Sequence, residues 1–162
     1  LEVQLNTDTN KFEQVKVKEV VSKVVLSFKD QIEKSDAVVD ISSFEEHIVP
    51  GFKSYFNSIF YHLLSNALKY SDPARKQTIT FSCVKINGNT HITVKDTGIG
   101  IDMRYAKDKI FTMYQRFHPE INCKGFGLFL VRSQLEAMGG TIAVESEVGK
   151  GTIFSIIFLK NK

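Results

Sequence analysis

The sequence lacks several features that would mark a specialised class of protein. Only two of its 162 residues are cysteines, and Cys83 and Cys123 do not have the spacing of metal ligands, so we expect a reducing, cytoplasmic setting. No apolar run approaches the roughly 20 residues that a membrane span requires. Residues 1–10 have neither a basic start nor an apolar stretch, which argues against a signal peptide. We therefore expect no direct contact between this domain and a membrane.

A strong excess of one charge is also absent. The formal net charge is +3, and the lysines and arginines are spread along the chain. This distribution predicts no nucleic-acid-binding surface. The hydrophobic fraction of 43% suits one globular domain, to which we assign residues 11–162, with residues 1–10 as a linker. Because the chain begins without methionine, we expect it to be part of a longer protein.

The spacing of apolar residues predicts three main helices. The first is an amphipathic helix of about 18 residues that begins near Val17. The second follows a chain break at Pro50-Gly51 and is stopped by Asp72-Pro73. The third runs from about Leu128 to Met138 and ends at Gly139, as expected for a glycine cap.

Strand patterns surround these helices. A short strand is expected at 37–41, and residues 78–86 and 90–96 flank Asn87-Gly88-Asn89, a strong hairpin signal. A final hairpin joins residues 141–146 to 152–160. Residues 103–124 have no regular pattern. Together these elements predict an α+β domain, a two-layer α/β sandwich with a mixed, mostly antiparallel sheet of about five strands.

Three short stretches have a composition suited to ligand binding. On the second helix, His62, Asn66 and Lys69 lie within an arc of about 60°, away from the apolar face. An amide oxygen is a suitable ligand for a hard divalent cation, and a lysine for a phosphate oxygen. The alternative is an ordinary solvated face. Before the third helix, Gly125 and Gly127 would let backbone N–H groups approach an anion, although a flexible loop explains them equally well.

The third stretch, KDTGIGID at 95–102, places an aspartate at the end of a strand and two glycines in the turn beyond it. It matches neither the P-loop nor the dinucleotide fingerprint, and no helical pattern follows residue 102, so a phosphate site is not expected here. Asp96 on a turn of bare backbone is better suited to a flat, amino-bearing group. A turn capped by its own aspartate is the alternative. The basic segment 103–124 between the two glycine-rich sites has the character of a lid over an anion.

The order of these motifs resembles the ATP-binding domain of bacterial sensor histidine kinases, in the superfamily that also contains gyrase and the MutL proteins. The resemblance rests on HLLSNALKYS, DTGIGI, GFGLFLV and GKGT, and covers about residues 10 to 160. IFTMYQRFH further resembles the phenylalanine box of histidine kinases, which gyrase-type relatives lack. The resemblance implies the Bergerat fold, an ATP lid, and ATP and Mg²⁺ as cofactors.

The resemblance also implies roles for individual residues. Asn66 would bind Mg²⁺, and Lys69 would contact a phosphate. Asp96 would accept a hydrogen bond from the adenine amino group, which discriminates ATP from GTP. The catalytic group would be His62, Asn66, Lys69 and Arg116, with Arg116 at the γ-phosphate. The remaining implied nucleotide contacts are Tyr70, Gly98 and Gly100 near the adenine, Lys124, Gly125, Gly127 and Leu128 at the phosphates, and Thr152 of the third glycine box behind the adenine.

Two positions depart from the family pattern. His62 stands where histidine kinases usually have asparagine and hydrolysing relatives have glutamate, so self-contained ATP hydrolysis is disfavoured. Cys123 replaces a glycine of the second glycine box, which would stiffen the lid hinge. None of the four histidines, His47, His62, His91 and His118, stands in the family's phosphoacceptor motif.

The expected function is therefore transfer of the γ-phosphate of Mg·ATP to a histidine on a separate dimerisation domain, for relay to the receiver domain of a response regulator. The dimerisation element is expected outside this chain. Two alternatives remain at this stage. One is a degenerate nucleotide-binding regulatory or docking module without transferase activity, and the other is an ATP-hydrolysing member of the superfamily.

Overall fold

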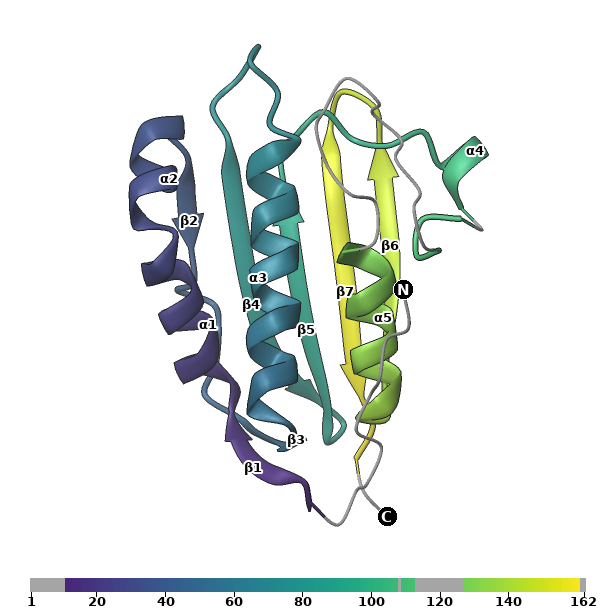
Figure 1. The fold of residues 1–162 in the computed structure, drawn as a ribbon. Helices are drawn as coiled ribbons and strands as arrows, with labels where there is room; N and C mark the ends of the chain where they lie inside the picture. The colour runs from purple at the N-terminus through teal and green to yellow at the C-terminus, as the bar shows by residue number, and fades with distance from the viewer. Residues whose placement is uncertain (1–10, 108, 113–126, 161–162) are drawn as a thin grey trace.

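The computed structural model describes residues 11–107, 109–112 and 127–160, and these ranges carry the structural statements that follow. Five strands form the main sheet in the order β2-β4-β5-β7-β6 (Figure 1). The β2 and β4 strands are parallel, and the other neighbours are antiparallel. The strands are β2 (Val38–Asp40), β4 (Thr78–Ile86), β5 (Asn89–Asp96), β6 (Gly140–Glu147) and β7 (Gly151–Phe158).

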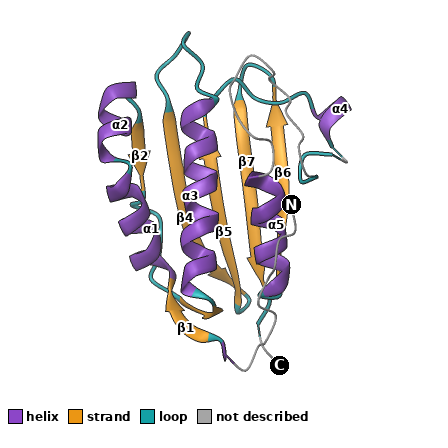
Figure 2. Cartoon of the chain, viewed as in Figure 1, coloured by secondary structure: helices purple, strands orange, loops and turns teal. Residues whose placement is uncertain are grey.

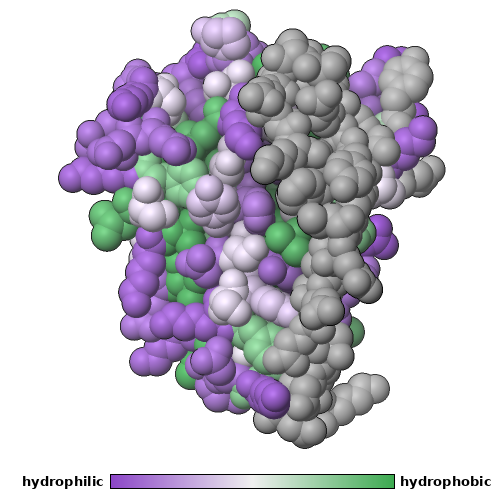
Figure 3. Space-filling view, viewed as in Figure 1, coloured by the Kyte–Doolittle hydropathy of each residue, from purple (hydrophilic) through white to green (hydrophobic). Residues whose placement is uncertain are grey.

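The helices α1 (Val17–Ser27), α3 (Lys53–Lys69) and α5 (Gly127–Ala137) lie side by side over one face of this sheet (Figures 1 and 2). The predicted two-layer α/β sandwich in the α+β class, with its mixed, mostly antiparallel sheet, is confirmed. None of the helices in the described ranges is long and apolar enough to cross a membrane. In Figure 3, hydrophilic side chains dominate the outer edge formed by α1 and α2 (Lys29–Ser35), and hydrophobic atoms show between the helices.

The central helix α3 is held to the sheet by its apolar side. Phe60 packs edge-on against Phe81 of β4 with ring centroids 6.1 Å apart, and Phe56 lies 5.5 Å from the ring of Phe158 on β7. Each such buried side chain stabilises the fold by about 1.5–3 kcal/mol. This packing fixes which side of α3 faces away from the sheet and so positions its polar residues.

Three local predictions were wrong. The first helix is two helices, because the chain breaks at Phe28, whose ring is buried and packs 5.1 Å from Tyr61, whereas α2 buries no residue. The expected break at Pro50-Gly51 is a strand, β3 (Ile48–Gly51), which pairs with β1 (Glu13–Lys16) in a separate two-stranded sheet where a proline is tolerated. A short helix, α4 (Met103–Ala106), follows residue 102, because the Asp102 carboxylate accepts a hydrogen bond from Arg104 N at 3.1 Å.

Candidate active site

Asp96 is the last residue of β5, and its side chain is nearly buried, with 8% of the residue exposed. Its neighbours across the sheet are Ile79 on β4 and Thr152 on β7. The Asp96 Oδ1 atom accepts a hydrogen bond from Gly98 N at 2.8 Å. Burial raises the pKa of this carboxyl to about 6, against the opposing effects of hydrogen bonds from the Gly98 and Thr152 backbone and of the positive charge of Arg75. A carboxylate held this way can accept one well-oriented hydrogen bond from a ligand.

The turn beyond Asp96 is closed by contacts between backbone atoms. A Cβ atom on Gly98 would lie 2.3 Å from Tyr70 O, and one on Gly100, where φ is +74°, would lie 2.0 Å from Glu147 O. The protein's own backbone lies beside both glycines, which lets the end of α3, the Asp96 turn and the β6–β7 turn come into contact. The implied role of these glycines in keeping room for the adenine stays a prediction.

Hydrogen bonds connect the same three segments. Ile99 N donates to Tyr70 O at 2.8 Å, and Gly149 N donates to Ile99 O at 2.9 Å. Ser146 on β6 accepts a hydrogen bond from Ile101 N at 2.8 Å, and its Oγ lies 2.7 Å from Thr152 Oγ1. These three segments, the C-terminal end of α3, the Asp96 turn and the β6–β7 turn, form the wall of the site. The Thr152 hydroxyl is bonded to this wall next to Asp96, and Tyr70 contributes its backbone carbonyl.

The polar side of α3 meets the start of α5. The half-buried His62 ring approaches Gly127 so closely that a Cβ atom there would stand 3.3 Å from His62 Nδ1. Burial, followed by the nearby Lys69 charge, lowers the pKa of this imidazole below its usual value, so it is neutral at pH 7. This contact places His62 beside the positive end of the α5 dipole.

The neighbouring polar groups of α3 keep their hydrogen-bonding capacity. Asn66 is half-buried and Lys69 is exposed, and neither side chain bonds or pairs with a residue in the described ranges. Leu128 packs its partly buried side chain on the hydrophobic core. The structure thus brings His62 and Gly127 together at one side of the site, and Tyr70, Asp96, Gly98, Gly100 and Thr152 at the other.

Several predicted residues lie outside the described residues. These are Arg116, Cys123, Lys124 and Gly125, with most of the proposed lid and phenylalanine box. Two residues at the site were missed. Ser146 could have been found from the final hairpin, whose register pairs it with Thr152. Arg75 could not, because its partners are backbone carbonyls that no sequence pattern marks.

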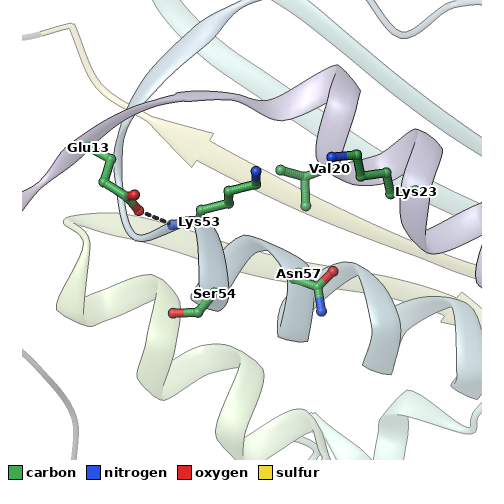
Figure 4. Close-up of a pocket in the computed structure, with 6 residues that line it drawn as sticks. All are labelled: Glu13, Val20, Lys23, Lys53, Ser54 and Asn57. Carbon is green, nitrogen blue, oxygen red and sulfur yellow. Dashed lines mark hydrogen bonds between the residues drawn. The ribbon is translucent and has the colours of Figure 1, made fainter.

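A separate depression of about 460 Å³ lies at the other end of α3 (Figure 4). It is formed between β1, α1 and the first turns of α3, where Glu13 Oε2 accepts a hydrogen bond from Lys53 N at 2.9 Å. No predicted site residue lines it. Its lining residues are Glu13, Val20, Lys23, Lys53, Ser54 and Asn57.

Comparisons with known proteins identify the family of this chain. A family model described as "Histidine kinase-, DNA gyrase B-, and HSP90-like ATPase" matches residues 53–162. Sensor histidine kinase GraS of Staphylococcus epidermidis is 40% identical over 99 residues, which cover 59% of this chain and 28% of GraS. The chain spans less than a third of the first curated relatives that it matches, from 18% to 31% of their length.

Solved structures of histidine kinases share the fold. The mycobacterial sensor histidine kinase MprB superposes with a TM-score of 0.78 at 22% identity, covering 91% of this chain and 96% of that one. Histidine kinase ThkA, solved in complex with response regulator protein TrrA, gives a TM-score of 0.75 at 20% identity and covers 93% of this chain and 42% of that one. With the family model matching more than half of its residues, the chain belongs to the histidine kinase-, DNA gyrase B- and HSP90-like ATPases, as an ATP-binding catalytic domain of the sensor histidine kinase type.

Proposed function

We propose that this site binds Mg·ATP with the adenine at Asp96 and the phosphates between α3 and the start of α5. At the adenine end, the Asp96 carboxylate accepts a hydrogen bond from the exocyclic amino group. Guanine presents a carbonyl at that position, and two acceptors facing each other in a buried site would repel, so the site favours ATP over GTP. Thr152, the neighbour of Asp96 on β7, is hydrogen-bonded to Ser146 and so fixes this part of the wall.

At the phosphate end, we assign the ligand contacts to polar groups of α3 that make no side-chain hydrogen bond to the described part of the chain. The Asn66 amide oxygen is suited to Mg²⁺, which usually takes one or two protein ligands and completes its shell with water and substrate phosphates. Bound there, the ion neutralises phosphate charge. Lys69 adds a point charge one turn further along the helix, and the backbone at Gly127 and Leu128 offers N–H groups at the positive end of α5.

The His62 side chain lies one turn before Asn66 on α3 and approaches Gly127 at the start of α5. A neutral imidazole beside a helix N-terminus can donate a hydrogen bond to a phosphate oxygen without adding charge. It supplies no carboxylate to activate water. We therefore propose transfer rather than hydrolysis, with Arg116 and Lys124 of the lid segment and Gly125 of the second glycine box completing the phosphate contacts.

We propose further that the γ-phosphate passes to a histidine on a separate dimerisation domain and from there to a response regulator, in the cytoplasm. The ThkA–TrrA complex supports the class of the second partner. Phosphoryl transfer depends mainly on positioning and charge neutralisation. The catalytic domain's own part is thus to hold the nucleotide with its terminal phosphate accessible to the incoming histidine.

The observation that supports this proposal most strongly is the buried Asp96 carboxylate, fixed by Gly98 N at 2.8 Å inside a wall of close backbone contacts. The test is to mix the domain with Mg²⁺, γ-labelled ATP and the dimerisation domain of the same protein. Label on the histidine of that domain supports the proposal. Binding without transfer would indicate a regulatory module, and free phosphate released by the domain alone would indicate a hydrolase.

A further inference from the structure

Arg75 lies in the loop between α3 and β4 and joins the two turns that form the wall of the site. Its Nε donates a hydrogen bond to Thr97 O at 2.7 Å, and its Nη2 donates to Gly98 O at 2.6 Å. Its Nη1 donates to Gly149 O in the β6–β7 turn. The side chain is about one-third exposed, at 34%, and Asp72 Oδ2 lies 3.5 Å from Nη1.

This arrangement requires the shape of a guanidinium. Arginine presents several N–H donors in a rigid, planar fork, whereas lysine has one compact ammonium group on a flexible stem. Three carbonyl oxygens from two separate turns converge on that fork. Without the guanidinium, these three carbonyl oxygens would need hydrogen bonds from water, and the two turns would lose the side chain that links them.

We propose that Arg75 is a positioning residue for nucleotide affinity, which holds the Asp96 turn against the β6–β7 turn so that the Asp96 carboxylate faces the base. This inference rests on the proposed function of the site as an adenine pocket. Arg75 bonds backbone oxygens and not the carboxylate itself, so its effect on the base is exerted through Gly98, whose N–H bonds Asp96 Oδ1.

Arg75 also acts on Asp96 by its charge, which opposes the effect of burial on the pKa of that carboxyl. Among the described residues, Arg75 is the charged side chain that lowers the pKa of Asp96. The neighbours of Asp96 across the sheet, Ile79 on β4 and Thr152 on β7, carry no charge. Removal of the charge is expected to raise the pKa of Asp96 above about 6. ATP affinity, which depends on the ionised carboxylate, would then begin to fall at a higher pH as the solution is acidified.

The test compares two variants of the 162-residue chain, Arg75→Lys and Arg75→Gln, by calorimetric titration with Mg·ATP. Both variants lose the fork, so both are expected to bind ATP at least about tenfold more weakly. Only Arg75→Gln loses the charge, so only its affinity profile is expected to shift to higher pH. A role in folding alone would not separate the two variants in this way. Lys76→Gln, at the exposed neighbouring position, is the matched control.

The possible outcomes are distinct. If the unaltered chain does not bind ATP, the proposed function itself fails. If the unaltered chain binds ATP and both variants bind within about twofold of it, the positioning role of Arg75 is overturned. Circular dichroism and thermal melts establish that each variant is folded, and Arg75→Lys alone decides the affinity question if Arg75→Gln does not fold.

Discussion

Gly151 lies directly against the backbone of Asp96. A Cβ atom on Gly151 would stand 2.0 Å from Asp96 O, and the φ of +120° at Gly151 lies in a region that other residues rarely adopt. Gly151, the first residue of β7, is thus in direct contact with Asp96, the last residue of β5. This contact joins the third glycine box of the sequence to the carboxylate that we assign to the adenine, and it accounts for the glycine without reference to a ligand.

Substitution of Gly151 by alanine is expected to destabilise the domain far more than the same change at Gly149. Both glycines have a positive φ, but nothing lies within 4 Å of a Cβ atom at Gly149, where φ is +82°. The Gly149 variant should lose only about 1–2 kcal/mol of unfolding free energy from the left-handed backbone. The Gly151 variant should lose more than about 3 kcal/mol of unfolding free energy, because the backbone at Asp96 would have to move to make room for the Cβ atom.

Urea unfolding of the two variants measures this difference. The comparison is internally controlled, since both residues are in or next to the same β6–β7 turn and undergo the same change. Equal losses at the two positions would show that the contact between Gly151 and Asp96 is easily relieved.

Replacement of Asp96 by asparagine is expected to weaken ATP binding. The amide can still accept the hydrogen bond from Gly98 N, but it loses the charge that strengthens the bond to the adenine amino group. Loss of one charge-assisted hydrogen bond costs about 1.5–3 kcal/mol, or roughly a 10- to 150-fold increase in Kd. Calorimetric titration with ATP and GTP measures both the loss and the change in base preference. Unchanged ATP affinity would disprove the adenine assignment.

The same substitution is expected to stabilise the ligand-free domain near neutral pH. The pKa of Asp96 is raised from 3.8 to about 6, so the folded state binds this proton more tightly than the unfolded state. The buried charge therefore disfavours folding above pH 6, by about 2–3 kcal/mol, and this cost disappears as the pH falls from about 6 towards 3.8. Asp96→Asn removes the cost at every pH.

Thermal melts of the two proteins across this range provide the measurement. The melting temperature of Asp96→Asn should exceed that of the unaltered domain near pH 7.5, and the gap should close on acidification. A difference in melting temperature that does not change with pH would mean that burial does not raise the pKa of the Asp96 carboxyl. A function that requires an ionised carboxylate in a buried site would thus be maintained at some cost in stability.

The features that could be predicted from the sequence are those determined by interactions between residues close together in the chain. Asn87 and Gly88 both have positive φ, 53° and 83°, as the two-residue turn signal predicted, and Gly139 ends α5 with φ +80°. These features are determined within a few residues of chain. The polar side of α3 was equally predictable, because the helical repeat alone places Asn66 and Lys69 on it.

The features that were missed depend on distant parts of the chain. Arg75 reads in the sequence as one more polar residue after a helix stop, and its role appears only when the turns at Gly98 and Gly149 fold onto it. The break at Phe28 likewise depends on where its ring is buried. The assignment of the glycines of the Asp96 turn to a binding site stays a prediction, and their close contact with Tyr70 and Glu147 depends on the tertiary structure.

Substitution of Asn66 by alanine is expected to abolish the effect of Mg²⁺ on ATP binding. The amide is assigned as the one protein ligand of the ion, and its side chain makes no bond within the described ranges that the change would break. Alanine is also the better helix former, so α3 should remain intact. In the presence of a chelator both proteins should bind ATP equally weakly, and added Mg²⁺ should tighten binding only in the unaltered domain.

Asn57→Ala, the same change on the exposed side of α3 at its other end, provides the control and should respond to Mg²⁺ normally. A variant at Asn66 that still binds ATP more tightly with Mg²⁺ would place the ion on other ligands.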